Sequence, residues 1–213
     1  MCLTRCGNKI QNLLDATRAL DFIAPLAFRL FLAPIFITGG LEKALHFSDT
    51  VGWMGSDGLN LPFPIVMAFL AAAAELVGGF CLLVGLAVRW MAVPMMITMV
   101  VAMVTVHWEN GWFALTPLNP ETSIAHVLAP IGFPGARESL ANSLEAKQRF
   151  DQINTLLEQQ SNYDWLTEKG SVTLLNNGIE FAATYFIMLL SLFFTGAGRW
   201  ISLDYWIHRL LRK

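Results

Sequence analysis

Residues 62–106 read PFPIVMAFLAAAAELVGGFCLLVGLAVRWMAVPMMITMVVAMVTV, and their charged residues are Glu75 and Arg89. A transmembrane helix needs about 20 mostly apolar residues, so the stretch is long enough for two helices with Arg89 between them. A soluble all-helical protein would have to bury the whole stretch on every side, including Pro94 and the methionines around it. We therefore expect two membrane-spanning helices here.

Two further stretches are long and apolar enough to span a bilayer. Residues 22–41 carry Arg29 as their one charge, and residues 181–198 carry none. The sequence therefore predicts an all-α polytopic membrane protein, a single membrane domain built as a four-transmembrane-helix bundle with an extra-cytoplasmic helical insertion between helices 3 and 4. The expected segments are an N-terminal interfacial helix at 1–21, spans at 22–46, 62–88, 90–107 and 174–198, an outer loop at 108–173 and a cytoplasmic tail at 199–213.

The outer loop is expected to contain a polar helix of its own, at about 136–160. Several apolar side chains fall on one side of that helix: Leu140, Leu144, Ile153, Leu156 and Leu157. The insertion is too small for an independent domain, so we expect it to cap the outer end of the bundle.

The composition excludes several classes of protein. Of the 213 residues, 55% are hydrophobic and 14% are charged, against about 25% charged residues in a soluble domain. Disordered chains are far more polar, and a nucleic-acid-binding protein needs a basic surface, whereas the net charge here is −2. The expected environment is therefore the lipid bilayer, with no nucleic acid as a partner.

Orientation follows from lysine and arginine, which are enriched in cytoplasmic segments. The N-terminal segment, the turn at Arg89 and the tail after residue 198 are basic, whereas residues 47–61 contain neither residue type. In residues 108–170 the acidic residues outnumber the basic ones. We expect a multi-pass protein of the cytoplasmic (inner) membrane with both termini in the cytoplasm. Residues 1–21 lack the apolar core and cleavage site of a signal peptide.

Two charged residues lie within the predicted spans. At about 1.5 Å per residue, Arg29 and Glu75 both lie about 10 Å from the cytoplasmic end of their helices. Because ionisable groups in lipid face partners or water, the sequence predicts an Arg29–Glu75 ion pair. The pair either fixes the register of the first two spans or forms a proton or ligand site.

A second polar layer is expected near the outer face, where spans end. Its residues are Glu42, Lys43, His107, Glu109 and Glu180. They either shape a polar pocket beneath the outer cap or each reach separately to the headgroup region. Arg199 and Asp204 form a further group at the cytoplasmic edge, for which we expect a structural role.

The sequence shows no catalytic constellation and no nucleotide-binding motif. A haem held by two histidines is not expected, since only His107 lies near a helix, and the histidines have no zinc-ligand spacing. Thioethers bind Cu(I) but also pack well in cores, and packing is the favoured role for a stripe on the third span. The stripe consists of Met91, Met95, Met99 and Met103.

Three fragments together resemble the DoxX family of membrane proteins: GGLEK at 39–43, ELVGG at 75–79 with LVGL at 83–86, and GAGRWISLD at 196–204. The resemblance covers about residues 20–110 and 174–206. It implies a four-helix bundle in the cytoplasmic membrane and a place in membrane oxidoreductase complexes, including quinone-reducing ones. It also suggests functional roles for Lys43, Glu75 and Arg199.

The long insertion departs from the short DoxX pattern. The strings NYDWLTEKGS at 162–171 and NNGIEFAATYF at 176–186 resemble the HvfX-like branch, whose members accompany peptide-modifying enzymes linked to metal stress. This resemblance implies a role in a stress response and argues against thiosulfate oxidation.

Three functions are compatible with these features. The first is an accessory subunit of a membrane redox or metal/oxidative-stress system that binds a quinone between helices; if the chain is enzymatic, it is a subunit of a membrane oxidoreductase. The second is a carrier or export partner for a modified peptide or small solute. The third is a membrane scaffold that docks a partner protein through the outer insertion.

Overall fold

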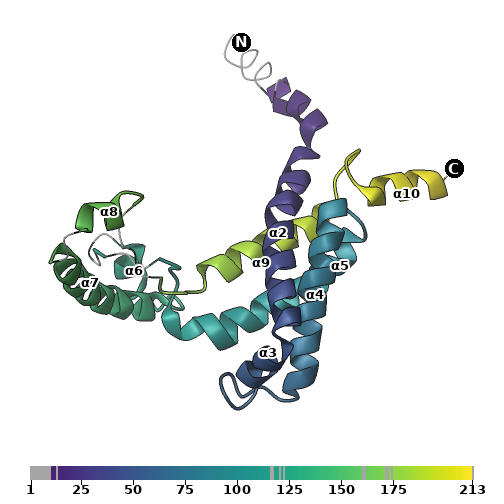
Figure 1. Ribbon diagram of the computed structural model, residues 1–213. Helices are drawn as coiled ribbons and strands as arrows, with labels where there is room; N and C mark the ends of the chain where they lie inside the picture. Colours follow the sequence, from purple (N-terminus) through teal and green to yellow (C-terminus); the bar gives the residue numbers. More distant parts are fainter. Residues whose placement is uncertain are drawn as a thin grey trace, which may run out of the picture. The chain divides into compact units, whose positions relative to one another are not determined.

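The computed structural model describes residues 11–12, 14–115, 118–119, 121, 123–159, 162–170, 173 and 175–212 (Figure 1). Its regular elements over these residues are helices, apart from an isolated bridge between Leu115 and Leu175. The all-helical prediction is therefore confirmed for this part of the chain. Two compact units are present, one formed by residues up to 98 together with those from 185 onward, the other by residues 99–184.

The first unit contains the helices that follow the predicted spans most closely. They are α2 (Ile23–Leu45), the short α3 (Phe47–Met54), α4 (Pro64–Val84), most of α5 (Val88–Ala102), most of α9 (Glu180–Thr195) and α10 (Leu203–Leu211). A 3-10 turn at Thr17–Leu20 precedes α2. Of the predicted N-terminal interfacial helix at 1–21, residues 1–10 and 13 lie outside the described residues.

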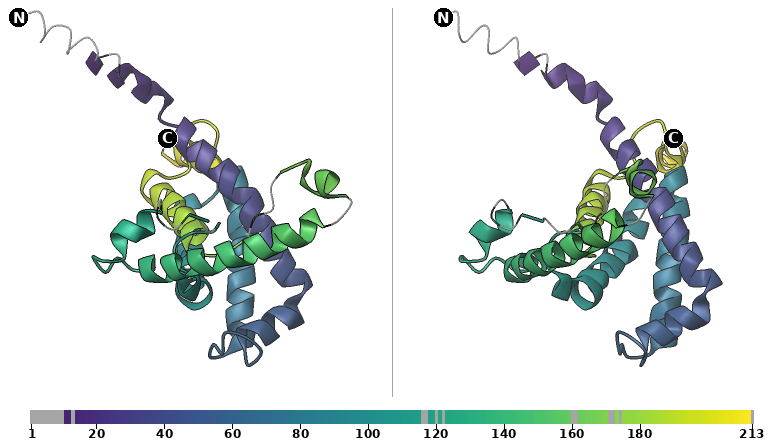
Figure 2. Two further views of the ribbon diagram at one scale, coloured as in Figure 1. Left: turned by 90° about the vertical axis from the view of Figure 1, so that its left-hand side faces the viewer. Right: turned by 60° about the vertical axis from the view of Figure 1, so that its left-hand side comes forward.

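Helices α2 and α4 lie side by side in all views (Figure 2) because glycines let their backbones approach. A Cβ atom on Gly40 would lie 2.5 Å from the backbone nitrogen of Leu76, and one on Gly79 would lie 2.8 Å from the Cγ1 atom of Ile37. Small residues serve this purpose where membrane helices pack, since lipid supplies no hydrophobic driving force between them. The close contact of α2 and α4 places their polar residues opposite one another.

Within the described residues, three helices are long and apolar enough to cross a membrane: Ile23–Leu45, Pro64–Val84 and Val88–Asn110. The third continues α5 through a π-helix at Met103–His107 and a 3-10 turn at Trp108–Asn110. Helix α9 has 16 residues, and at 1.5 Å per residue it is about 24 Å long, shorter than the roughly 30 Å of a hydrocarbon core. A four-span bundle therefore stays a prediction.

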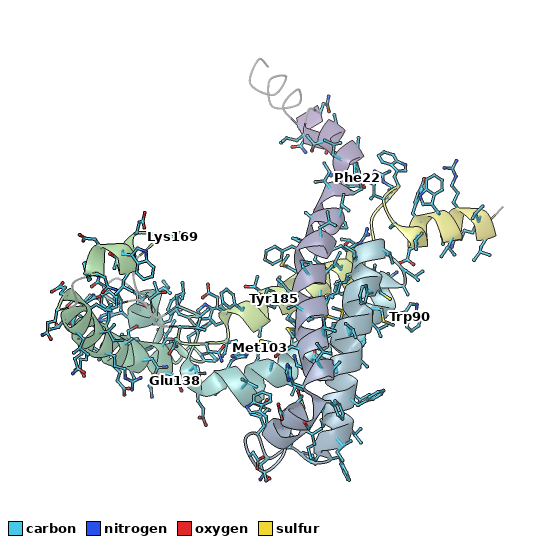
Figure 3. All side chains as sticks on the ribbon, in the orientation of Figure 1. Phe22, Trp90, Met103, Glu138, Lys169 and Tyr185 are labelled. Carbon is cyan, nitrogen blue, oxygen red and sulfur yellow. The ribbon has the colours of Figure 1, made fainter. Side chains whose placement is uncertain are left out.

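The surfaces of these helices are suited to lipid. Large apolar side chains on α2, α4 and α5 are at least half exposed, among them Phe31, Phe69, Leu70 and Ile97. Trp90 at the start of α5 is 78% exposed and projects outward (Figure 3), as is typical of aromatic residues at a membrane surface. The chain is thus a membrane protein with several candidate spans.

The second unit contains the insertion. Its helices are α6 (Ile124–Leu128), α7 (Ala136–Glu158) and α8 (Tyr163–Thr167). Helix α7 starts after Gly135, whose φ of 76° is in the left-handed region that suits glycine. The buried face of α7 consists of small residues, Ala136, Ser139, Ser143 and Ala146. Leu144 and Leu156, expected on a common side, are 54% and 63% exposed.

Candidate functional site

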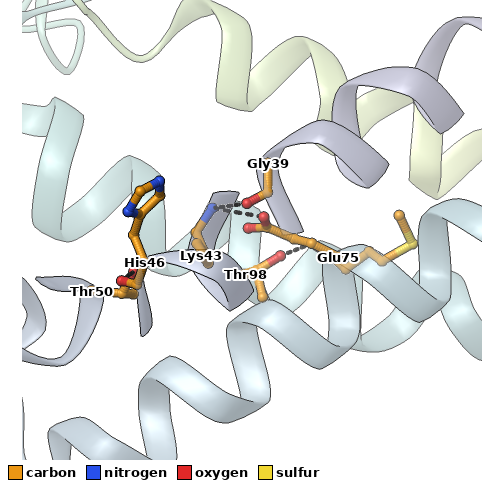
Figure 4. A network of polar contacts seen from close by, with 7 residues as sticks. Gly39, Lys43, His46, Thr50, Glu75 and Thr98 are labelled. Atoms are coloured by element: carbon orange, nitrogen blue, oxygen red, sulfur yellow. Dashed lines mark hydrogen bonds and ion pairs between the residues drawn. The ribbon is translucent and has the colours of Figure 1, made fainter. Parts of the chain in front are cut away.

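An ion pair inside the first unit joins α2 to α4. The ammonium nitrogen of Lys43 lies 2.7 Å from Oε2 of Glu75 (Figure 4) and donates to the carbonyl of Gly39 at 3.4 Å. The Glu75 side chain is 9% exposed and the Lys43 side chain is 28% exposed. The pair is therefore buried on the Glu75 side and accessible on the Lys43 side.

Local helix geometry explains how these two side chains meet. Side chains on a helix lean toward its N-terminus, so Lys43 reaches back one turn from the end of α2, and its ammonium lies near Gly39 rather than beyond the helix. Gly39 leaves room for the carboxylate, since a Cβ atom there would lie 3.1 Å from Oε2 of Glu75. From the sequence, Lys43 was expected in the outer polar layer, and its pairing with Glu75 was not predicted.

The predicted Arg29–Glu75 ion pair is wrong. Arg29 is 1% exposed, and its guanidinium donates to backbone carbonyls instead. Nε donates to Leu82 at 2.7 Å and Nη2 donates to Leu83 at 3.2 Å, while Nη1 donates to Ala197 at 2.7 Å and to Ile201 at 2.8 Å.

Arg29 binds backbone carbonyls because it lies beside the end of α4, where such carbonyls lack partners within the helix. Helix α4 ends at Val84, with Gly85 as its C-cap at a φ of 72°, and the last four carbonyls of a helix have no partner within it. A guanidinium presents five N–H donors in a fixed fork, so Arg29 satisfies several such acceptors at once. A Cβ atom on Gly85 would lie 2.5 Å from Nη2 of Arg29, so glycine at this position also makes room for the guanidinium.

Arg199 and Asp204 lie at the same end of the first unit but bind different groups. Arg199 pairs with Asp21, with Nη2 at 2.6 Å and Nε at 3.0 Å from Oδ1. The Asp204 carboxylate accepts from the backbone N–H groups of Ala87 and Val88, at 2.6 and 3.1 Å. Asp204 thereby caps the start of α5, and its own N–H donates to the carbonyl of Gly85 at 2.9 Å.

The predicted outer cluster divides between the two units. Glu42 and Lys43 belong to the first, where Glu42 lies 3.6 Å from His46. In the second unit, Nδ1 of His107 lies 2.7 Å from the carbonyl of Asn177, Glu109 is exposed, and Oε2 of Glu180 accepts from the N–H of Ala114 at 2.9 Å. A pocket that combines all of these residues stays a prediction.

An asparagine network in the second unit was missed by the sequence analysis. The carbonyl of Asn110 accepts from the side-chain amides of Asn142, at 2.9 Å, and of Asn176. The amide of Asn110 donates to the carbonyl of Asn177 at 3.3 Å. These bonds tie the end of the third candidate span to α7 and to the segment before α9. The adjacent asparagines at 176–177 are the sequence feature from which this network could have been predicted.

The methionine stripe is partly buried. Met95 and Met99 are 0% and 8% exposed, and Met91 and Met103 are intermediate. The side chain of Met95 lies against Gly78 of α4. Among the described residues, no three His, Cys, Asp or Glu side chains lie together in a way that could hold a metal ion.

The comparisons with known proteins match the part of the chain that holds the Lys43–Glu75 pair. Residues 24–108 match the DoxX family model. The DoxX match includes Arg29, Lys43 and Glu75 and stops before the insertion, so the resemblance to the HvfX-like branch stays a prediction.

One similar protein carries the name of an oxidoreductase. The putative oxidoreductase CatD of Bacillus subtilis (strain 168) is 37% identical to this chain over 84 residues. The similar region covers 39% of this chain and 60% of the relative, so the chain spans less than two thirds of that protein. No solved structure matches the chain at a significant level.

Proposed function

We propose that the chain is a DoxX-type accessory subunit of a membrane redox system, and that the Lys43–Glu75 pair contacts a quinone headgroup. The observation that carries this proposal is the pair itself. The Glu75 side chain is 9% exposed and the Lys43 side chain is 28% exposed, and both lie on otherwise apolar helices. Ionisable residues inside a membrane are costly and mark functional sites by default.

The chemistry of the pair fits a quinone. A quinone carbonyl accepts hydrogen bonds, and Lys43 is the donor of the pair that reaches the surface. Glu75 holds the ammonium in place, and its carboxyl group can take up and release a proton when a quinone is reduced to a quinol. Electrons come from an oxidoreductase partner. The DoxX match and the name of the Bacillus relative support a redox role.

The test uses the purified full-length chain in lipid nanodiscs with a short-chain benzoquinone as the probe. We expect saturable binding by the parent and binding at least about tenfold weaker in Lys43→Met and in Glu75→Gln, because a buried polar group left without its partner is costly. Lys147→Met makes the same change on the polar helix α7 and serves as the matched control. Equal binding by all four proteins, or none by the parent, contradicts the proposal.

We further propose that the outer insertion docks the partner of this system. Leu144 and Leu156 on α7 and Trp165 on α8 are more than half exposed, and exposed apolar groups on an otherwise polar element are typical of interaction sites. Crosslinking from each of these positions should capture the same protein, and deletion of residues 136–160 should abolish the crosslink from Trp165. A deletion chain that keeps its partner rules this surface out.

A further inference from the structure

A cavity of about 610 Å³ lies in the first unit, where the start of α2, the end of α9 and α10 meet. Its volume is within the range of small-molecule sites, about 300–1,000 Å³. Its walls are mostly apolar, with several polar and charged side chains among them. The residues that matter to its chemistry are Phe22, Ala24, Pro25, Arg199, Asp204 and His208.

Helix α10, which contributes to the cavity lining, has the features of a helix that lies at a membrane surface. In Figure 1, α10 runs across the direction of α2 and α4, which belong to the same unit. Leu203, Trp206, Ile207 and Leu210 follow the i, i+3, i+4, i+7 pattern of one helix face, and all are 42–69% exposed. An amphipathic helix that lies across the spans with its apolar face exposed is suited to the membrane surface.

The other side of α10 turns toward the cavity. Asp204, Tyr205 and His208 belong to the cavity lining, whereas the apolar residues of α10 do not. Helix α10 therefore has the polar residues of the cavity on one side and exposed apolar residues on the other. An amphiphilic molecule can place its polar part in the cavity and its apolar part in the surrounding lipid.

The charges around the cavity favour an anion. Both acidic residues of the lining have partners, since Asp21 pairs with Arg199 and the oxygens of Asp204 accept from the N–H groups of Ala87 and Val88. The bonds of Arg199 use Nε and Nη2, and no described residue accepts a hydrogen bond from its Nη1.

Further arginines belong to the first unit. They are Arg89, Arg209 and Arg212, and none of them forms an ion pair within the part of the chain that the structure describes. Arg89 lies next to the lining, because a Cβ atom on Gly196 would lie 3.9 Å from its Cδ atom. The local field at this end of the unit is therefore positive.

We propose that this cavity binds one anionic phospholipid, with the phosphate beside Arg199 and His208 and the acyl chains leaving along the apolar residues of α2 and α9. The site is separate from the Lys43–Glu75 pair and does not depend on quinone binding. A free phosphate ion shares the chemistry of the headgroup, so the experiment must distinguish the two.

The experiment is native mass spectrometry of the delipidated full-length chain titrated with phosphatidylglycerol, phosphatidylcholine and inorganic phosphate in separate series. We expect one tightly bound phosphatidylglycerol, weaker phosphatidylcholine and no retained phosphate. Ala24→Phe fills the cavity without changing a charge, and it should remove the tight site. Ala27→Phe is the matched control, since Ala27 is also exposed on α2 but lies outside the lining.

Two charge variants test the headgroup contact. Arg199→Gln and His208→Gln should each weaken phosphatidylglycerol binding, the arginine variant by about fivefold, as expected for one basic side chain at an anionic membrane surface. Arg149→Gln on α7 should bind as the parent does. Tight binding that survives both Ala24→Phe and Arg199→Gln overturns the proposal, and inorganic phosphate bound as tightly as phosphatidylglycerol overturns the assignment to a lipid.

Discussion

At the scale of single residues, the two cations of α2 show how differently a membrane protein can stabilise a positive charge. Arg29 is fully buried, and its partners are backbone carbonyls that the helix ends leave free. Lys43 is partly exposed and pairs with a carboxylate. The first arrangement is structural, and the second leaves a donor within reach of a ligand.

Arg29→Leu should lower the stability of the protein more than a change that breaks the Lys43–Glu75 pair. It removes the donor to the buried carbonyl of Ala197 and one of the two donors to that of Leu82, and each buried acceptor left unsatisfied costs about 1–3 kcal/mol. We expect a loss of about 3 kcal/mol or more in the free energy of unfolding, measured by thermal unfolding in detergent. An Arg29→Leu variant as stable as an exposed control, Arg149→Leu, contradicts the role assigned to this arginine.

Glu75→Ala should be milder. The Lys43 side chain is already 28% exposed and can extend its ammonium toward the membrane surface once its partner is gone. We expect a loss of stability smaller than that of Arg29→Leu by the same thermal measurement. The reverse order would mean that the Lys43–Glu75 pair, rather than the arginine, holds α2 and α4 in register.

At the scale of elements, the connection between α4 and α5 is held by a residue far along the chain. Asp204, the second residue of α10, accepts from the N–H groups at the start of α5 and donates its own N–H to the carbonyl of Gly85. An acidic side chain at this position satisfies orphan donors and interacts favourably with the positive end of the helix dipole.

Asp204→Ala should therefore destabilise the start of α5. Loss of a helix N-cap costs about 1–2 kcal/mol, and we expect this change in the free energy of unfolding together with faster hydrogen exchange at residues 87–90. Asp204→Asn keeps one acceptor oxygen where the carboxylate uses two, so it should recover only part of the stability. If the alanine variant shows exchange at these amides no faster than the parent, the capping role is wrong.

At the scale of the whole molecule, the predicted topology places the two termini on one side of the membrane and the insertion on the other. The uneven distribution of lysine and arginine supports this orientation. A green fluorescent protein fused after residue 212 should fluoresce, whereas alkaline phosphatase inserted at Gly58 or at Leu156 should be active, because it folds only outside the cytoplasm. Phosphatase activity at the C-terminus would reverse the orientation.

The sequence by itself determined the three candidate spans, because a run of apolar residues as long as a bilayer is thick forms a helix whatever its neighbours are. It also identified Arg29 and Glu75 as charges within the predicted spans, and Arg199 and Asp204 as a polar group at the cytoplasmic edge. Only the tertiary structure decided their partners. Which groups come together depends on side-chain reach and on where helices end, so Arg29 donates to the carbonyls of Leu82 and Leu83, and Lys43 pairs with the carboxylate of Glu75.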